Sequence, residues 1–177
     1  MRPRIGISRC LLGEDVRYDG SNKLSGAVVD LTPFVEWVPV CPEVETGMGV
    51  PREPIQLVRR ADGVSSGRGR VRLKGVHTGE DWTERMTRWS VTRVLDLAAI
   101  GISGFVLKAR SPSCGPAAVL VHGYGDAPSP TGRGFFAEAL ARDIPGLPII
   151  DEEALEDPES RERFLQSVRA FAATLRR

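Results

Sequence analysis

The stretch Gly104-Phe105-Val106-Leu107-Lys108-Ala109-Arg110-Ser111-Pro112-Ser113-Cys114-Gly115 decides how the chain is expected to fold. Its first four residues form an apolar run with the length of a buried strand, and the run stops in a Ser-Pro-Ser-Cys-Gly turn. A strand that ends in a turn with a thiol, two hydroxyls and two cations is typical of the functional edge of α/β proteins. The stretch therefore predicts a site at the end of this strand, with Cys114 in it.

The other two cysteines of the chain stand in the same kind of place. Ile5–Ser8 has the pattern of a first strand, and Cys10 lies just past its end. Trp37–Val40 has the pattern of a second strand, and Cys41 follows it directly. Because the carboxyl ends of parallel strands share one edge of a sheet, the three thiols converge if these strands are neighbours.

Alternating strand and helix patterns along the chain predict an α/β fold in a single domain, residues 1–177. We expect a mainly parallel sheet with helices on both faces, in a Rossmann-like arrangement. The remaining strands are expected at 55–59, 70–74, 117–121 and 147–150, with a hairpin excursion across 61–69 and irregular loops at 42–54 and 123–134. The helices are expected at 23–34 (capped by Ser21 or Asn22), 82–100, 135–142 and in a C-terminal extension, 157–177.

Composition excludes several function classes. The 177 residues are 41% hydrophobic and 27% charged, which is ordinary for a globular protein, and no apolar run has the roughly 18 residues of a membrane span. A net charge of +1 gives no reason to expect a nucleic-acid backbone as partner. Three cysteines, an odd number without a secretion signal, predict reduced thiols in the cytoplasm.

The thiols leave several chemistries open. Three cysteines can hold a zinc ion with water as fourth ligand, or an iron–sulfur cluster with one open iron. The long intervals between them also fit three separate buried thiols, and Cys114 alone fits a metal-free nucleophile. His77 and His122 lie away from the thiol turns, so neither is in place to serve as ligand or base. The spacing alone does not choose among these.

Three motifs carry a resemblance to a known family. They surround the three cysteines in order: Ile7-Ser8-Arg9-Cys10-Leu11-Leu12-Gly13 with Arg17-Tyr18-Asp19-Gly20, then Val38-Pro39-Val40-Cys41-Pro42-Glu43-Val44 with Gly47 and Pro51-Arg52, and then Leu107–Gly115. In combination they resemble the DUF523 family, which includes the thiouracil desulfidases, and the similarity spans about residues 5–155. The segment from about Asp157 onward is an extension beyond that pattern.

The resemblance implies a cofactor and a reaction. It implies that Cys10, Cys41 and Cys114 hold a [4Fe-4S] cluster whose fourth iron has no protein ligand. A thiocarbonyl sulfur, as in 2-thiouracil or 4-thiouracil, is then expected to bind that iron and to be replaced by water, giving uracil and hydrosulfide without net consumption of electrons. The implied partners are a small thiolated pyrimidine and the machinery that assembles clusters.

The neighbours of the cysteines complete the expected site. Glu43, two residues after a ligand, is the first candidate for moving protons, with Glu45 as its weaker rival, and Ser111 is the second catalytic candidate. Substrate binding and charge balance are expected from a polar set: Ser113, Arg17, Asp19, Asn22, Arg52 and Lys108. The alternatives are a metal-free or zinc cysteine enzyme, and a binding module for thiolated nucleosides or RNA.

Overall fold

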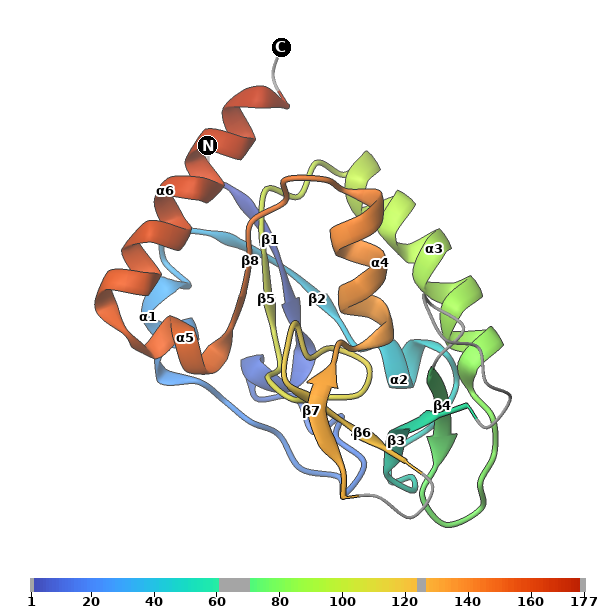
Figure 1. Ribbon diagram of the computed structural model, residues 1–177. Coiled ribbons are helices and arrows are strands. Elements are labelled where there is room, and N and C mark those ends of the chain that lie inside the picture. Colours follow the sequence, from blue (N-terminus) through green and yellow to red (C-terminus); the bar gives the residue numbers. More distant parts are fainter. Residues whose placement is uncertain (1, 61–70, 124–126, 176–177) are drawn as a thin grey trace.

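The computed structural model describes residues 2–60, 71–123 and 127–175, and a four-stranded parallel sheet runs through its centre (Figure 1). The sheet has the order β2-β1-β5-β8, and each neighbouring pair is parallel. Its strands are β1 (Arg4–Ser8), β2 (Glu36–Val40), β5 (Phe105–Leu107) and β8 (Ile149–Asp151). The expected parallel sheet is confirmed, and the strands that precede the three cysteines are neighbours in it.

Helices cover both faces of this sheet, as expected (Figure 1). The described helices are α1 (Gly26–Leu31), α2 (Pro42–Glu45), α3 (Thr83–Ala99), α4 (Phe135–Asp143), α5 (Glu152–Glu156) and α6 (Pro158–Thr174). Side chains of α3 and α4 pack with Phe105 and Leu107, whereas those of α1, α5 and α6 pack with Val106. None of the described helices has the length and apolar character needed to cross a membrane.

Burial on both faces explains why the central strands are apolar throughout. Ile5, Ile7, Phe105, Val106 and Leu107 are fully buried, which is the pattern of a parallel strand covered by helices on each side. Between two of them, Gly6 leaves room for a neighbour. A Cβ atom there would lie 2.2 Å from the Phe105 ring, so glycine is required where β1 and β5 pair.

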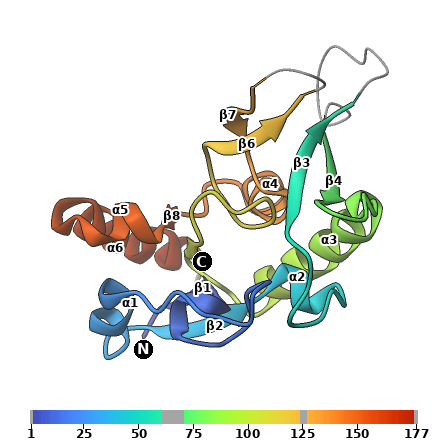
Figure 2. The ribbon, with the colours of Figure 1, turned by 90° about the horizontal axis from the view of Figure 1, so that it is seen from below.

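A second sheet of four strands lies beside the first (Figure 2). It has the order β4-β3-β6-β7, in which β3 pairs antiparallel with β4 and parallel with β6, and β6 pairs antiparallel with β7. Its strands are β3 (Ile55–Arg59), β4 (Val71–Gly75), β6 (Val119–His122) and β7 (Ser129–Gly132). The predicted antiparallel pair is confirmed, while the expected excursion at 61–69 lies outside the described residues.

Three local expectations were wrong. The loop expected at 123–134 contains β7, because its polar residues can serve as a short edge strand beside β6. The helix expected at 23–34 is only Gly26–Leu31 and is capped by Ser25, whose hydroxyl accepts from the amide of Val28, while Ser21 and Asn22 bond within the preceding loop. The loop after Cys41 begins as α2, since Pro42 at the first helical position favours a turn of helix.

Candidate functional site

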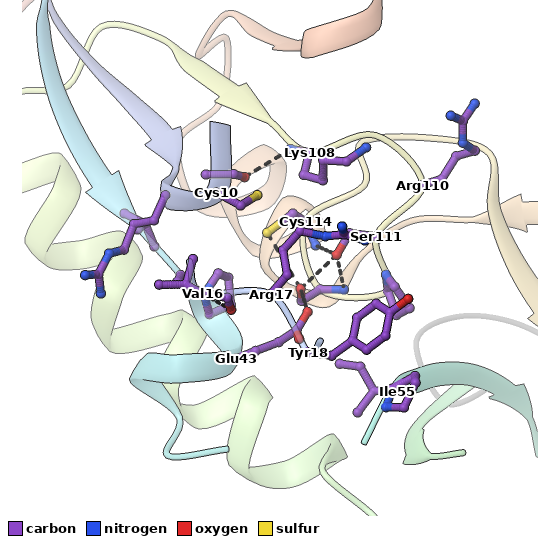
Figure 3. Close-up of a pocket in the computed structure, with 18 of the residues that line it drawn as sticks. Cys10, Val16, Arg17, Tyr18, Glu43, Ile55, Lys108, Arg110, Ser111 and Cys114 are labelled. Atoms are coloured by element: carbon purple, nitrogen blue, oxygen red, sulfur yellow. Dashed lines mark hydrogen bonds between the residues drawn. The ribbon is translucent and has the colours of Figure 1, made fainter. Parts of the chain in front are cut away.

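The three cysteines meet at the carboxyl edge of the parallel sheet. Cys10 lies in η1, a turn of 3-10 helix (Arg9–Leu12) directly after β1, and Cys41 joins β2 to α2. Cys114 lies in the turn after β5. All three line one cavity of about 260 Å³ (Figure 3). Cysteines up to 104 positions apart in the sequence therefore border one cavity, as the topology predicts.

Burial keeps the three thiols protonated when no metal is present. Cys41 and Cys114 are buried and Cys10 is partly so. Loss of hydration raises the pKa of the Cys10 thiol to about 12, and it also raises the pKa of Cys41 and of Cys114. A hydrogen bond from the Ser8 side chain offsets only part of the effect at Cys114. Such thiols are poor free nucleophiles at neutral pH but become thiolates when a metal binds them.

Ser111 shapes the turn that carries Cys114. Its hydroxyl oxygen accepts hydrogen bonds from the backbone N–H groups of Ser113 at 3.3 Å and Cys114 at 3.2 Å, and its carbonyl accepts from Gly115 at 2.7 Å. Gly134 closes over the turn, since a Cβ atom there would lie 2.6 Å from the Ser113 carbonyl. The turn is thus stabilised by hydrogen bonds to Ser111 and by the close approach of Gly134, a residue that the sequence analysis did not identify.

Glu43 begins a hydrogen-bonded path that reaches Cys114 (Figure 3). One carboxylate oxygen, Oε2, accepts from Arg52 Nε at 2.8 Å and Nη2 at 2.5 Å, and the other accepts from the Ser113 hydroxyl at 2.7 Å. The Ser113 hydroxyl also lies 3.0 Å from that of Ser111 and 3.6 Å from the Cys114 sulfur. Because the single Ser113 proton goes to Glu43, we infer that Ser111 donates to Ser113. The path joins a nearly buried carboxylate to a thiol turn.

Arg52 holds Glu43 and the loops around it. Its side chain is only 7% exposed, and it donates to the carbonyls of Val16 at 3.0 Å and Gly49 at 2.8 Å as well as to Glu43. Its backbone N–H donates to the carbonyl of Tyr18 at 2.9 Å. Arg52 therefore lines the cavity, as expected of a site residue, but the protein itself accepts the hydrogen bonds of its guanidinium.

Lys108 lines the cavity on the side away from Glu43 (Figure 3). It is held there by Glu152, a residue outside the cysteine motifs. The Lys108 ammonium pairs with the Glu152 carboxylate, and the other Glu152 oxygen accepts from the Ala109 backbone N–H at 2.6 Å. The Lys108 backbone N–H donates to Ser8 Oγ at 3.0 Å. Ser8 and Glu152 were missed by the sequence reasoning, although Ser8 ends β1 and Glu152 directly follows β8 at the same edge of the sheet.

The loop after Cys10 contributes Arg17 and Tyr18 to the cavity, but not Asp19 or Asn22. The Arg17 guanidinium lies 5.4 Å from the centre of the Tyr18 ring and donates to Ser21 Oγ at 3.0 Å. Tyr18, which the sequence reasoning did not select, is the one aromatic side chain among the described residues that line the cavity. Asp19 bonds to Ser21, and Asn22 donates to Asp15 at 2.7 Å, so both stabilise the loop itself.

Glu45, the alternative candidate to Glu43 for proton transfer, does not line the cavity. Its Oε1 accepts from the Cys41 backbone N–H at 2.9 Å, and its Oε2 lies 3.2 Å from the Arg93 guanidinium on α3. Glu45 therefore ties the Cys41 corner to a helix, while Glu43, two residues earlier, faces the cavity.

The set of three thiols fits the protein ligands of an iron–sulfur cluster with one open iron. Among the described residues, no group of three or more His, Cys, Asp or Glu side chains could hold a single ion. A zinc ion draws its thiolates to about 2.3 Å, whereas the cysteines around a four-iron cluster each bind a different iron and stand further apart. Three thiols around one cavity match this arrangement of ligands.

Fold and site together define an α/β protein with a three-thiol cavity at the carboxyl edge of a parallel sheet. The chain belongs to the 2-thiouracil desulfurase family, whose model matches residues 5–152. It is 30% identical over 152 residues to the uncharacterized protein YbbK of Bacillus subtilis (strain 168), covering 85% of this chain and 97% of that one.

A solved structure shares this architecture. The chain is similar, with 28% identity and a TM-score of 0.71, to the [4Fe-4S]-dependent thiouracil desulfidase TudS, a DUF523 protein. The match covers 93% of this chain and 99% of that one. The resemblance stated from the cysteine motifs is thereby confirmed at the level of the family, and family and neighbour both support an enzyme.

Proposed function

We propose that this chain is a [4Fe-4S]-dependent desulfidase that converts the C=S group of a thiolated pyrimidine, such as thiouracil, into C=O and releases hydrosulfide. The observation that carries the proposal is that Cys10, Cys41 and Cys114, all the cysteines of the chain, line one cavity together with Glu43. Membership of the 2-thiouracil desulfurase family supports the substrate class, and the likeness to TudS supports the cofactor.

The three thiolates would hold the cluster, one on each of three irons. When bound, the cluster would supply an open iron that acts as a Lewis acid for the thiocarbonyl sulfur without a net change of electrons. Lys108 and Arg52 also line the cavity, each as the cationic partner of a glutamate, Glu152 and Glu43 respectively.

Glu43 is the proposed proton acceptor. Replacing sulfur by oxygen consumes one water, of which one proton leaves with the sulfur as hydrosulfide and the other must be taken by a base. The Glu43 carboxylate lines the cavity and is only 14% exposed, so it meets a water or a pyrimidine nitrogen with little competing solvent. Arg52 fixes Oε2, and Ser113 donates to Oε1, the oxygen that faces the thiol turn.

Ser111 and Ser113 are proposed to pass protons along the same path. Their hydroxyls are 3.0 Å apart, and Ser113 joins them to Glu43. A proton that Glu43 accepts can therefore be shared with the turn that carries Cys114. Arg17 and Tyr18 also line the cavity and would contact a pyrimidine ring bound there.

The metal-free alternative has weaker support. Burial raises the pKa of each thiol, which disfavours the thiolate that nucleophilic catalysis needs. No histidine is among the described residues that line the cavity, so a base of the usual kind for a cysteine nucleophile is lacking there. We further propose a cytoplasmic protein that receives its cluster from the assembly machinery and acts on small thiolated pyrimidines rather than on nucleic acid.

The test is sulfide release under anaerobic conditions. Protein reconstituted with iron and sulfide should release hydrosulfide from 2-thiouracil or 4-thiouracil in step with uracil formation, and an iron chelator that strips the cluster should abolish the reaction. The Cys114→Ser variant, which lacks one of the three proposed cluster ligands, should lose the reaction in the same way. Full turnover after complete removal of iron would contradict the cluster mechanism and favour the metal-free enzyme. Retention of short thiolated RNA without any turnover would favour the binding module.

A further inference from the structure

We propose that Glu152 is a positioning residue of the site. Its carboxylate holds both the Lys108 ammonium and the backbone of Lys108–Ala109, which we call the corner, between the loops that carry Cys10 and Cys114. The proposal rests on the proposed function for the identity of the ligand, but its structural part stands on contacts within this chain. Glu152 lies outside all three cysteine motifs and does not line the cavity.

Both oxygens of Glu152 are used at one corner. One pairs with the Lys108 ammonium, and the other accepts from the Ala109 N–H at 2.6 Å, so the carboxylate fixes a side chain and the backbone beside it. The Lys108 ammonium also donates to the Ala109 carbonyl at 3.2 Å. Lys108 and Glu152 side chains are 20% and 13% exposed, which makes the pair far less screened than a surface salt bridge.

The corner connects two of the three thiol loops. Its backbone donates from Lys108 to Ser8, the last residue of β1, and Ser8 hydrogen-bonds to Cys114. Cys10 follows Ser8 by two residues, and the charges of Lys108 and Glu152 both act on it. Since β8 pairs with β5 and Glu152 directly follows β8, the sheet itself places this carboxylate beneath the corner.

Removal of the Glu152 charge has a defined consequence. The wild-type Lys108–Glu152 pair is neutral. Glu152→Gln leaves the partly buried Lys108 ammonium without its carboxylate partner. Its positive charge then acts on the thiolates and sulfides of a bound cluster. A net positive change raises the reduction potential of an iron–sulfur cluster, and a net negative change lowers it. Glu152 thus acts through Lys108, not by contact with substrate.

The first measurement uses the protein without cofactor. Amide hydrogen exchange at Ala109 should accelerate about tenfold or more in Glu152→Ala, the loss expected for a hydrogen bond to a charged group. Glu153→Gln is the matched control, because this neighbouring glutamate is exposed and pairs with Arg110 instead. Equal exchange at Ala109 in wild type and Glu152→Ala would overturn the positioning role, whether or not the protein ever binds a cluster.

The second measurement is the reduction potential of the loaded protein. Glu152→Gln should raise it, Lys108→Met should lower it, and the double variant should return near the wild-type value. Glu36→Gln, which removes the partner of Arg4 at the other end of the sheet, should leave it unchanged. A merely structural role would not give shifts of opposite sign. Shifts of the same sign, or none, would overturn the charge coupling. If wild-type protein takes up no cluster, the proposed cofactor fails, and amide exchange at Ala109 alone decides the positioning role.

Discussion

Two sides of the cavity carry the same kind of group and use it differently. On one side Glu43 pairs with Arg52, and on the other Glu152 pairs with Lys108; the two glutamates are 14% and 13% exposed. Both are tied to the stretch that carries Cys114, Glu43 through Ser113 and Glu152 through Ala109. Yet Glu43 lines the cavity and Glu152 does not. An ion pair alone therefore does not distinguish the two glutamates; access to the cavity does, and it is the ground on which we propose Glu43 as the catalytic one.

The largest effect is expected when the charge of Glu43 is removed. Glu43→Gln should keep the cluster but lower kcat by about 10² to 10⁴, the range for loss of a general base. Single-turnover sulfide release and iron content on the same sample check this. Glu36→Gln, which removes the partner of Arg4 at the far end of the sheet, is the control and should leave kcat unchanged. Wild-type kcat in Glu43→Gln would remove this carboxylate from the mechanism.

A smaller effect is expected from the link between Glu43 and the thiol turn. Ser113→Ala removes the hydroxyl that donates to Glu43 Oε1, which leaves a nearly buried charged oxygen without that donor. The expected cost of about 1–3 kcal/mol corresponds to a loss of roughly 5-fold to 160-fold in kcat/KM. Steady-state kinetics measure it. Ser103→Ala is matched, since this serine is equally buried but bonds to Arg4 at the opposite end of β5; if both variants lose activity alike, the path through Ser113 has no catalytic part.

The smallest effect is expected outside both sides of the cavity. Asp19 and Asn22 were expected to bind substrate, but they stabilise their own loop and do not line the cavity. Asp19→Asn and Asn22→Ala should each change kcat/KM by less than about threefold, as for substitutions away from a site. Michaelis constants for thiouracil check this directly. A tenfold rise in KM would restore these residues to the substrate site and show that the loop closes over the cavity when substrate binds.

Sequence reasoning located one side of the site better than the other, for a physical reason. Ser111, Ser113 and Glu43 are within three residues of a cysteine, so they could be found once the thiols were seen to follow parallel strands. Glu152 is 38 positions beyond Cys114 and becomes a neighbour only because β8 pairs with β5. The parallel sheet was predictable because short apolar runs indicate buried strands from the local sequence alone.

Other features depended on tertiary contacts. The edge strand β7 is polar and forms only because β6 offers it hydrogen bonds. Gly134 looked like part of a loop, and its importance lies in the Ser113 carbonyl that it approaches. Asp19 belongs to the Cys10 motif and Asn22 lies just beyond it, yet neither lines the cavity, because sequence proximity does not set the direction in which a loop side chain points.

The most direct test of the central claim is the metal content of the anaerobically reconstituted chain and of its three single Cys→Ser variants. If Cys10, Cys41 and Cys114 hold one cluster, wild-type protein should contain about four irons and four sulfides per chain. Each variant should lose most of this iron while it retains its fold, measured by far-ultraviolet circular dichroism. A wild-type protein that binds one zinc and no iron, or a variant that keeps all four irons, would contradict the account.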